Sequence, residues 1–213
     1  MPPARLAVLG LLAVLAAGCG SSRPGRVRTV TVDAPSSSTV PVATRPASPT
    51  RAVPTRLTRL PGPCDTLLTD FLVSQALGGQ QFRGKDVFVV GQPEPDIGRI
   101  GYLNCRYGVT GDKAEVEIGV SLYRTAAQAA KRIPATVDDY TAHGATAADV
   151  TVAGEAGRLL TGGSGPGYTL PLLVVASGQR TVAVTIDRAV VSAANVARDA
   201  AAVARLALQR TGG

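Results

Sequence analysis

The sequence predicts an α+β protein in which an antiparallel β-sheet is packed with helices, and three observations support this fold class. Residues 62–213 contain segments that alternate apolar and polar side chains, as strands do, and segments with the spacing of amphipathic helices. These segments follow one another in the order α-βββ-α-ββββ-α, separated by glycine-rich turns. The 152 residues are also enough to build one hydrophobic core.

The first two helices are predicted from apolar spacing and from their end signals. One spans residues 65–77 and stops at Gly78. Thr125 is a good N-cap for the alanine-rich helix that follows it. Pro134 is expected to break or kink that helix before residues 136–143, because proline lacks the backbone N–H group that a helix interior needs.

The third helix and the strands follow from the same reasoning. Ser192 is expected to cap a helix whose apolar stripe (Val196, Ala200, Val203, Ala207) lies opposite a polar one (Arg198, Asp199, Arg205, Gln209). One strand is expected to have a face in water, since Val116, Ile118, Val120 and Leu122 alternate with Glu115, Glu117, Gly119 and Ser121. The seven predicted strands span residues 87–90, 101–109, 114–123, 150–152, 156–161, 170–176 and 181–187.

Residues 1–19 have the organisation of an export signal. Arg5 precedes 12 apolar and small residues, fewer than the roughly 20 that a membrane-spanning helix needs. The stretch Ala16-Ala17-Gly18-Cys19 resembles the bacterial lipobox, although the expected leucine stands at position 15. We therefore expect diacylglycerol on Cys19 and a lipid-anchored protein on the extracytoplasmic face of the cell membrane. The alternative is an ordinary secretory signal that leaves Cys19 as an odd cysteine.

Residues 20–61 read as a disordered linker rich in Pro, Ser, Thr and Arg. They contain seven prolines, seven threonines, six serines and no aromatic residue, which is too little apolar surface to offset the entropy of ordering. Seven arginines there face one aspartate, whereas residues 62–213 carry 14 basic and 14 acidic side chains. The neutral domain is not expected to bind nucleic acid. The basic linker is either a solubilising spacer, with or without glycosylation, or a segment that lies on anionic headgroups.

With Cys19 assigned to lipid, Cys64 and Cys105 form an even pair in an exported chain, and a disulfide between them is expected. A redox or metal pair is disfavoured, because no Cys-x-x-Cys motif occurs and His143 is the single histidine. We expect neither a metal nor another cofactor.

No catalytic constellation is found. The glycine-rich stretch 161–167 lacks the Lys-Ser/Thr ending of a phosphate-binding loop and is expected to be a hairpin loop. Asp138 and Asp139 are neighbours on a predicted helix and point apart, and His143 is expected at the helix C-terminus. Phe82 and Tyr168 are the candidates for an exposed binding rim, because they lie beside charged residues and in the glycine-rich loop respectively.

Several short motifs resemble those of a large family of actinobacterial, mycobacterial-type lipoproteins of unknown function. They are Pro63-Cys64-Asp65, Leu67-Leu68-Thr69, Gly78 at a helix end, Asn104-Cys105-Arg106-Tyr107 and Leu122-Tyr123. Members are similar to PsbP-like domains, with helices on an antiparallel sheet, and some relatives bind envelope lipids or help transporters. The resemblance implies this fold, an extracytoplasmic address and the disulfide, and it implies no catalytic residues.

The favoured function is a non-enzymatic, membrane-anchored lipoprotein that binds an envelope lipid or glycolipid, or an envelope protein. An apolar pocket between sheet and helix would support this interpretation. One alternative is a cell-envelope hydrolase, which requires a cleft with a coupled polar pair such as His143 with Asp138 or Asp139. A second is a ligand-sensing accessory domain, which differs from the favoured function in needing a conformational change on binding.

Overall fold

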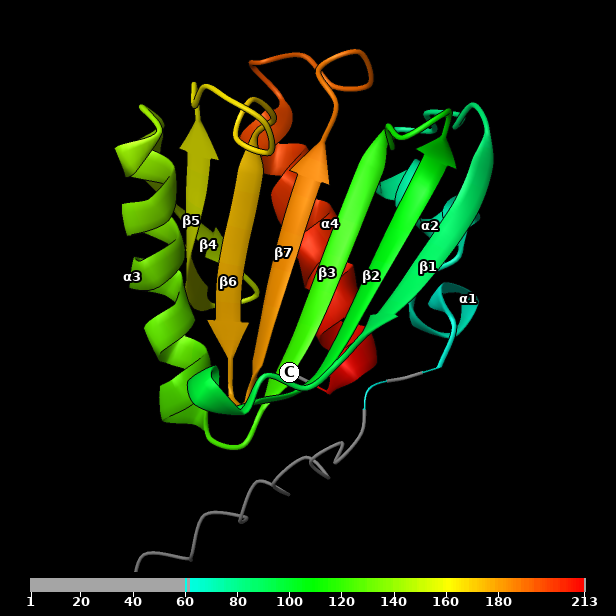
Figure 1. Cartoon of the computed structure of the whole chain (residues 1–213). Helices are drawn as coiled ribbons and strands as arrows, with labels where there is room; N and C mark the ends of the chain where they lie inside the picture. Colours follow the sequence, from blue (N-terminus) through cyan, green and yellow to red (C-terminus); the bar gives the residue numbers. More distant parts are fainter. Residues whose placement is uncertain (1–59, 61, 213) are drawn as a thin grey trace, which may run out of the picture. The chain divides into compact units, whose positions relative to one another are not determined.

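The computed structural model describes residue 60 and residues 62–212 (Figure 1). The expected export signal over 1–19, with Cys19, lies outside the described residues, and so does the expected linker over 20–61 apart from Leu60. No helix among the described residues is long and apolar enough to cross a membrane.

The described chain follows the predicted order α-βββ-α-ββββ-α, with two differences. The first predicted helix is two helices, and a short 3-10 helix stands between the first two strands. The elements are α1 (Cys64–Leu67), α2 (Asp70–Ala76), β1 (Lys85–Gly91), η1 (Pro95–Ile97), β2 (Arg99–Val109), β3 (Val116–Tyr123), α3 (Ala126–Ala142), β4 (Thr146–Val152), β5 (Glu155–Thr161), β6 (Leu172–Ser177), β7 (Arg180–Ile186) and α4 (Val196–Thr211).

The strands form one fully antiparallel sheet in the order β1-β2-β3-β7-β6-β5-β4. Helix α3 packs on one face, mainly over β5, β6 and β7. Helices α1, α2 and α4 lie on the other face (Figure 1). The α+β class and the antiparallel sheet are confirmed, while the more specific PsbP-like arrangement stays a prediction.

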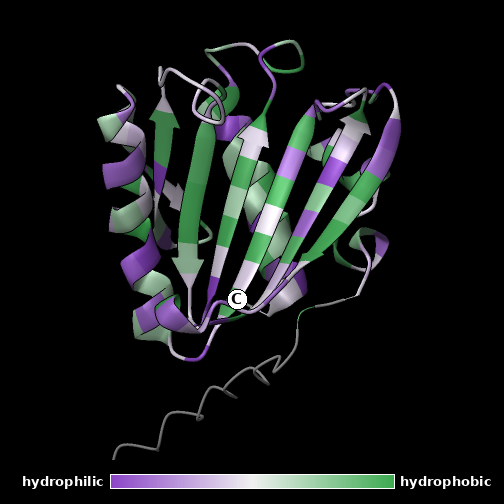
Figure 2. Ribbon diagram, viewed as in Figure 1, coloured by the Kyte–Doolittle hydropathy of each residue, from purple (hydrophilic) through white to green (hydrophobic). Residues whose placement is uncertain are grey.

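The face of β3 that was expected to be in water is only partly so: Glu117 keeps a side chain that is 36% exposed, but its neighbours on that face are buried. Val116, Ile118 and Val120 are fully buried against the α4 side of the sheet, as predicted. Gly119 and Ser121 on the opposite face are buried too, because α3 packs on this face and the Tyr102 ring lies over Gly119. Strand β6 is hydrophobic from Leu172 to Ala176 for the same reason (Figure 2).

Helix α3 runs through Pro134 as one continuous helix, so of the expected break or kink the break does not occur. The N–H group that proline lacks would bond to the carbonyl of Ala130, and both residues are exposed, so water can satisfy that carbonyl. Thr125 caps the helix as predicted, within a capping box that includes Gln128.

Helix α4 begins later than expected and buries one of its charged residues. Ser192 does not cap it: the Ser192 carbonyl accepts bonds in a turn, and the helix starts at Val196. The apolar stripe is buried as predicted, but Asp199 on the expected polar side is only 5% exposed. Its carboxylate is satisfied by the Arg198 guanidinium at 2.7 Å, which is why an acidic residue is tolerated there.

The predicted disulfide joins Cys64 in α1 to Cys105 in β2, with Cα atoms 5.5 Å apart. It closes a loop of about 42 residues, for which the chain-entropy treatment gives about 4 kcal/mol of stabilisation.

The single helix predicted over 65–77 is interrupted at Leu68 and Thr69, which adopt extended backbone angles. Thr69 then caps α2, its hydroxyl accepting a bond from the Leu72 N–H.

Candidate functional site

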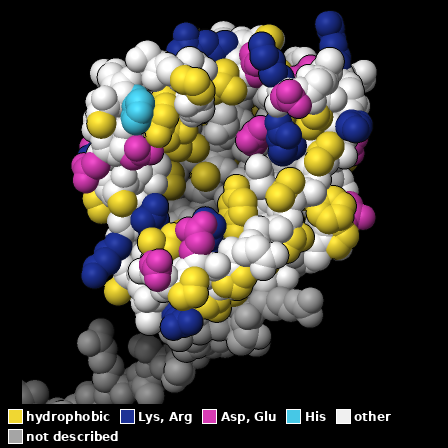
Figure 3. All heavy atoms as spheres, viewed as in Figure 1, with side chains coloured by type: hydrophobic (Ala, Val, Ile, Leu, Met, Phe, Trp, Pro, Cys, Tyr) yellow, Lys and Arg dark blue, Asp and Glu magenta, His cyan; other side chains and the backbone are white. Residues whose placement is uncertain are grey.

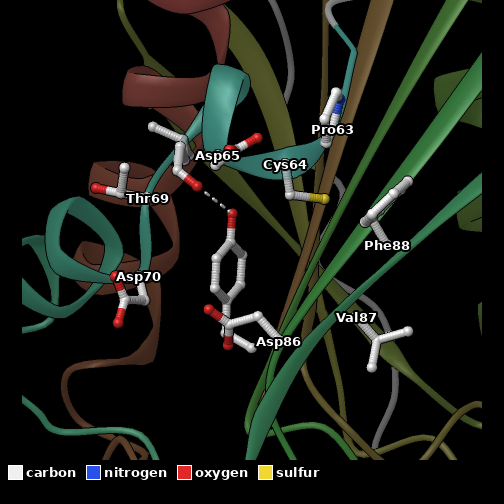
Figure 4. Close-up of a pocket in the computed structure, with 10 residues that line it drawn as sticks. Pro63, Cys64, Asp65, Thr69, Asp70, Asp86, Val87 and Phe88 are labelled. Carbon is white, nitrogen blue, oxygen red and sulfur yellow. Dashed lines mark hydrogen bonds between the residues drawn. The ribbon is translucent and has the colours of Figure 1, made fainter.

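The break between α1 and α2 borders a pocket on the face of the sheet opposite α3. Its volume is about 280 Å³, and it lies between α1, the start of α2 and strand β1 (Figure 4). Most of the surface is apolar. The lining residues are Pro63, Cys64, Asp65, Leu68, Thr69, Asp70, Asp86, Val87, Phe88 and Tyr107. We call this hollow the α1–β1 pocket.

Tyr107 forms a fixed part of the pocket wall. Its side chain is 1% exposed overall, and its hydroxyl donates a 2.7 Å hydrogen bond to the Leu68 carbonyl at the helix break (Figure 4). Burial raises the pKa of Tyr107, and the nearby carboxylates raise it further. The phenol is therefore neutral and acts as a donor that holds α1 against β2.

Three carboxyl groups, those of Asp65, Asp70 and Asp86, surround this apolar space. Burial raises the pKa of Asp86, the Gly108 N–H lowers it in part, and the charge on Asp70 raises it. These groups do not form a metal site: the described residues contain no group of three or more His, Cys, Asp or Glu placed to hold a metal ion. The pocket combines apolar walls with negative charge, so it suits a cationic group carried on an apolar body.

A second hollow of about 340 Å³ adjoins the pocket and shares Asp70 and Asp86 with it. It contains Phe82, one of the two predicted rim residues. Phe82 is half-buried, and its ring centroid is 6.0 Å from that of Tyr107. Local sequence patterns did not bring Phe82 together with α2, because their proximity depends on how the chain folds back between α2 and β1.

Large apolar side chains are exposed around these two hollows. Phe88 is 52% exposed, Val89 47% and Val90 67% on strand β1, and Phe71 on α2 is 63% exposed. Strand β1 is also an edge of the sheet, so one side of its backbone is unpaired within the sheet. An apolar edge strand is a common place for another molecule to bind.

Tyr168, the other predicted rim residue, is half-buried and engaged within the molecule. Its ring stacks on His143 with centroids 3.7 Å apart, and its hydroxyl donates to the Asp139 carboxylate at 3.1 Å. Tyr140 packs edge-on against it and donates to the Gly167 carbonyl. The glycine-rich stretch is the β5–β6 connection, as predicted, and these contacts tie it to the C-terminal end of α3.

The hydrolase alternative requires a coupled polar pair such as His143 with Asp139, and these two side chains lie close together but are exposed to solvent. His143 caps the C-terminus of α3, as expected, and its ring Nδ1 lies 2.8 Å from the Asp139 backbone carbonyl and 4.0 Å from the carboxylate. The nearby Ser164 hydroxyl donates to the His143 carbonyl rather than to the ring. These contacts stabilise a helix end and a loop.

A third hollow, of about 410 Å³, lies on the opposite face of the sheet, between α3 and β3. Figure 3 shows this face of the molecule, which is hollowed in its middle. We call the third hollow the α3–sheet cleft. It was not predicted, because its walls come from four separate segments. They contribute Asp112, Lys113, Ala114 and Glu117, then Tyr140, then Gly167, Thr169 and Leu170, and finally Thr185 and Asp187.

Comparisons with known proteins identify no family for this chain. No family model matches the sequence, and no curated protein matches it. Among solved structures, the chain is similar to the extracellular domain of PknH from Mycobacterium tuberculosis, with 15% identity and a TM-score of 0.41 over 70% of this chain and 95% of that chain. Membership of the actinobacterial lipoprotein family stays a prediction.

We predict that Asp86→Asn stabilises the fold at neutral pH. The pKa of Asp86 is raised on folding, so its ionised form costs stability once the pH rises above the unfolded value of 3.8. An asparagine carbonyl can still accept the Gly108 N–H bond without a charge. Calorimetry should show a higher midpoint than wild type at pH 7 and a smaller difference at pH 3.

Asp138→Asn, on the exposed side of α3, is the control and should change stability by less than about 0.5 kcal/mol. An Asp86→Asn variant that is less stable than wild type at pH 7 would contradict this electrostatic interpretation.

Proposed function

We propose that this chain is a membrane-anchored, extracytoplasmic lipoprotein whose domain binds an envelope protein at the α1–β1 pocket. The observation that carries the proposal is an apolar pocket, bordered by carboxylates, directly beside an exposed apolar edge strand. Anchored aromatic and aliphatic side chains next to polar groups are typical of protein interfaces. The role is binding, without a chemical step.

The charge around the pocket favours a protein over the lipid that sequence analysis left open. Asp65, Asp70 and Asp86 repel the phosphate of an anionic headgroup, whereas they attract a lysine or arginine side chain. The volume of about 280 Å³ is also small for a lipid with two acyl chains and lies just below the usual range of small-ligand pockets, which starts at about 300 Å³. A side chain or two from a partner fits this space better.

Exposed phenylalanines extend the same surface beyond the pocket. Phe88 lines the pocket and Phe71 lines the adjoining hollow, and each is more than half exposed. A partner that covered both would bury two aromatic side chains, each of which commonly dominates interface energetics. The partner surface is therefore expected to be apolar at its centre and basic at its rim.

The anchor in this proposal is diacylglycerol on Cys19, followed by the linker over 20–61. Two acyl chains give stable attachment where one would be marginal. A chain of 42 residues has ends roughly 35 Å apart as a coil, which gives the domain reach toward neighbouring proteins.

Replacing the lipidation residue tests the anchor. Cys19→Ala should move the protein from the detergent phase of the membrane fraction to the culture medium or to an unprocessed precursor, because the thiol that takes the lipid is gone. Globomycin treatment of wild-type cells, which blocks cleavage before a lipidated cysteine, should accumulate a precursor that carries the lipid, whereas any Cys19→Ala precursor carries none. Equal membrane retention of both proteins would contradict lipid anchoring.

Binding at the pocket is tested by Phe88→Ser in the full chain, purified from envelopes after mild cross-linking. A protein enriched with wild type should be recovered about tenfold less, because Phe88 is the exposed aromatic residue of the pocket. Ile100→Ser is the matched control, since Ile100 is an exposed apolar residue of β2 that lines none of the described hollows.

The same eluates should be extracted for lipid. Loss of a lipid or glycolipid, rather than of a protein, in the Phe88→Ser sample would replace the protein partner with a lipid ligand. Equal recovery of every component with both variants would contradict binding at this pocket.

A further inference from the structure

We infer that the α3–sheet cleft is a second binding site, for a neutral ligand rich in hydroxyl groups, such as a segment of an envelope polysaccharide. The cleft has a volume of about 410 Å³, within the range of small-ligand sites. It lies on the face of the sheet opposite the α1–β1 pocket, so both sites can be occupied at once. This inference does not depend on the proposed protein partner.

Polar side chains with spare hydrogen-bonding capacity converge on the cleft. Within the described part of the chain, no hydrogen bond or ion pair engages the side chains of Asp112, Lys113, Thr169 and Thr185. They offer one ammonium donor, two hydroxyls that both donate and accept, and one carboxylate acceptor. A sugar presents hydroxyls of the same dual kind, so donors and acceptors on both sides can be matched.

The charges of the cleft disfavour an anion. Asp112, Glu117 and Asp187 stand against Lys113 alone among the lining residues. Glu117 is paired with Arg106 at 2.9 Å, and Asp187 accepts the Ala189 N–H at 2.8 Å. What remains free is one carboxylate and one ammonium group. A phosphate or a uronic acid would meet the Asp187 carboxylate, which has no cationic partner among the lining residues, whereas a neutral sugar would meet only hydrogen-bonding partners.

The walls are held in place before a ligand arrives. Tyr140 lines the cleft and its hydroxyl donates to the Gly167 carbonyl at 3.1 Å, which fixes one wall to another. Tyr168 ties the same loop to α3 through its bond to Asp139 and its stack on His143. A preformed site loses less entropy on binding. The contacts among Tyr168, Asp139 and His143 therefore have a structural role, which is to hold the loop that forms a wall of the cleft.

The inference is tested by co-sedimentation of the full chain with delipidated, protease-treated envelope polysaccharide from the source organism. Wild type should sediment with it, and neutral fragments released from the same material by mild acid should compete. Thr185→Val keeps the β-branched shape on β7 and removes one hydroxyl, so it should weaken binding about fivefold. Asp112→Ala, on an exposed turn, is a second variant with little effect on folding; it removes the carboxylate acceptor and should also bind more weakly.

Phe88→Ser should bind the polysaccharide as wild type does, which separates this site from the α1–β1 pocket. Three results would overturn the inference: no co-sedimentation of wild type, binding by Thr185→Val and Asp112→Ala that is as tight as that of wild type, or binding only to material that was not treated with protease. The last result would indicate a peptide ligand instead of a sugar.

Discussion

The attachment of α1 to strand β2 is the constraint on which the rest of the candidate site depends. The Cys64–Cys105 disulfide fixes the start of the domain to the sheet, and the Tyr107 hydroxyl bonds to the Leu68 carbonyl, where the chain leaves the helical path. A buried tyrosine hydroxyl and a buried carbonyl would each cost free energy if left unpaired. Their bond therefore stabilises an interruption that isolated helix energetics would oppose. The α1–β1 pocket lies beside that interruption.

The domain presents two unlike surfaces on opposite faces of one sheet. The α1–β1 pocket is apolar with carboxylates and lies beside exposed aromatic residues. The α3–sheet cleft is lined by hydroxyls and partly compensated charges. Both proposals follow from that contrast, since apolar surface and negative charge favour a basic protein surface while uncommitted hydroxyls favour a sugar. A domain of this kind would hold a protein near the envelope polysaccharide.

Local sequence patterns predicted the elements and the disulfide, but not the contacts that shape the site. Leu67, Leu68 and Leu72 keep helical spacing, so their pattern predicts no break in the helix. The local signal for a break was Thr69-Asp70, which is typical of a helix start. The contact that stabilises the break comes from Tyr107, which is distant in the sequence. The burial of Gly119 depends on α3 and Tyr102 rather than on β3 itself. Pro134 was expected to break or kink the helix, but the hydrogen bond that it cannot make falls on the exposed side, and the helix continues. Asp70 on α2 and Asp86 on β1 line the same pocket because of how these two elements pack, which local sequence patterns do not predict.

The most direct test of the central claim is photo-cross-linking in the living cell from a reactive residue placed at position 88, at the edge of the α1–β1 pocket. The same residue at position 148, exposed on strand β4 at the opposite edge of the sheet, is the comparison. Our account predicts a distinct adduct with another envelope protein from position 88 that is absent from position 148. A lipid adduct at 88, or indistinguishable labelling from both positions, would contradict it.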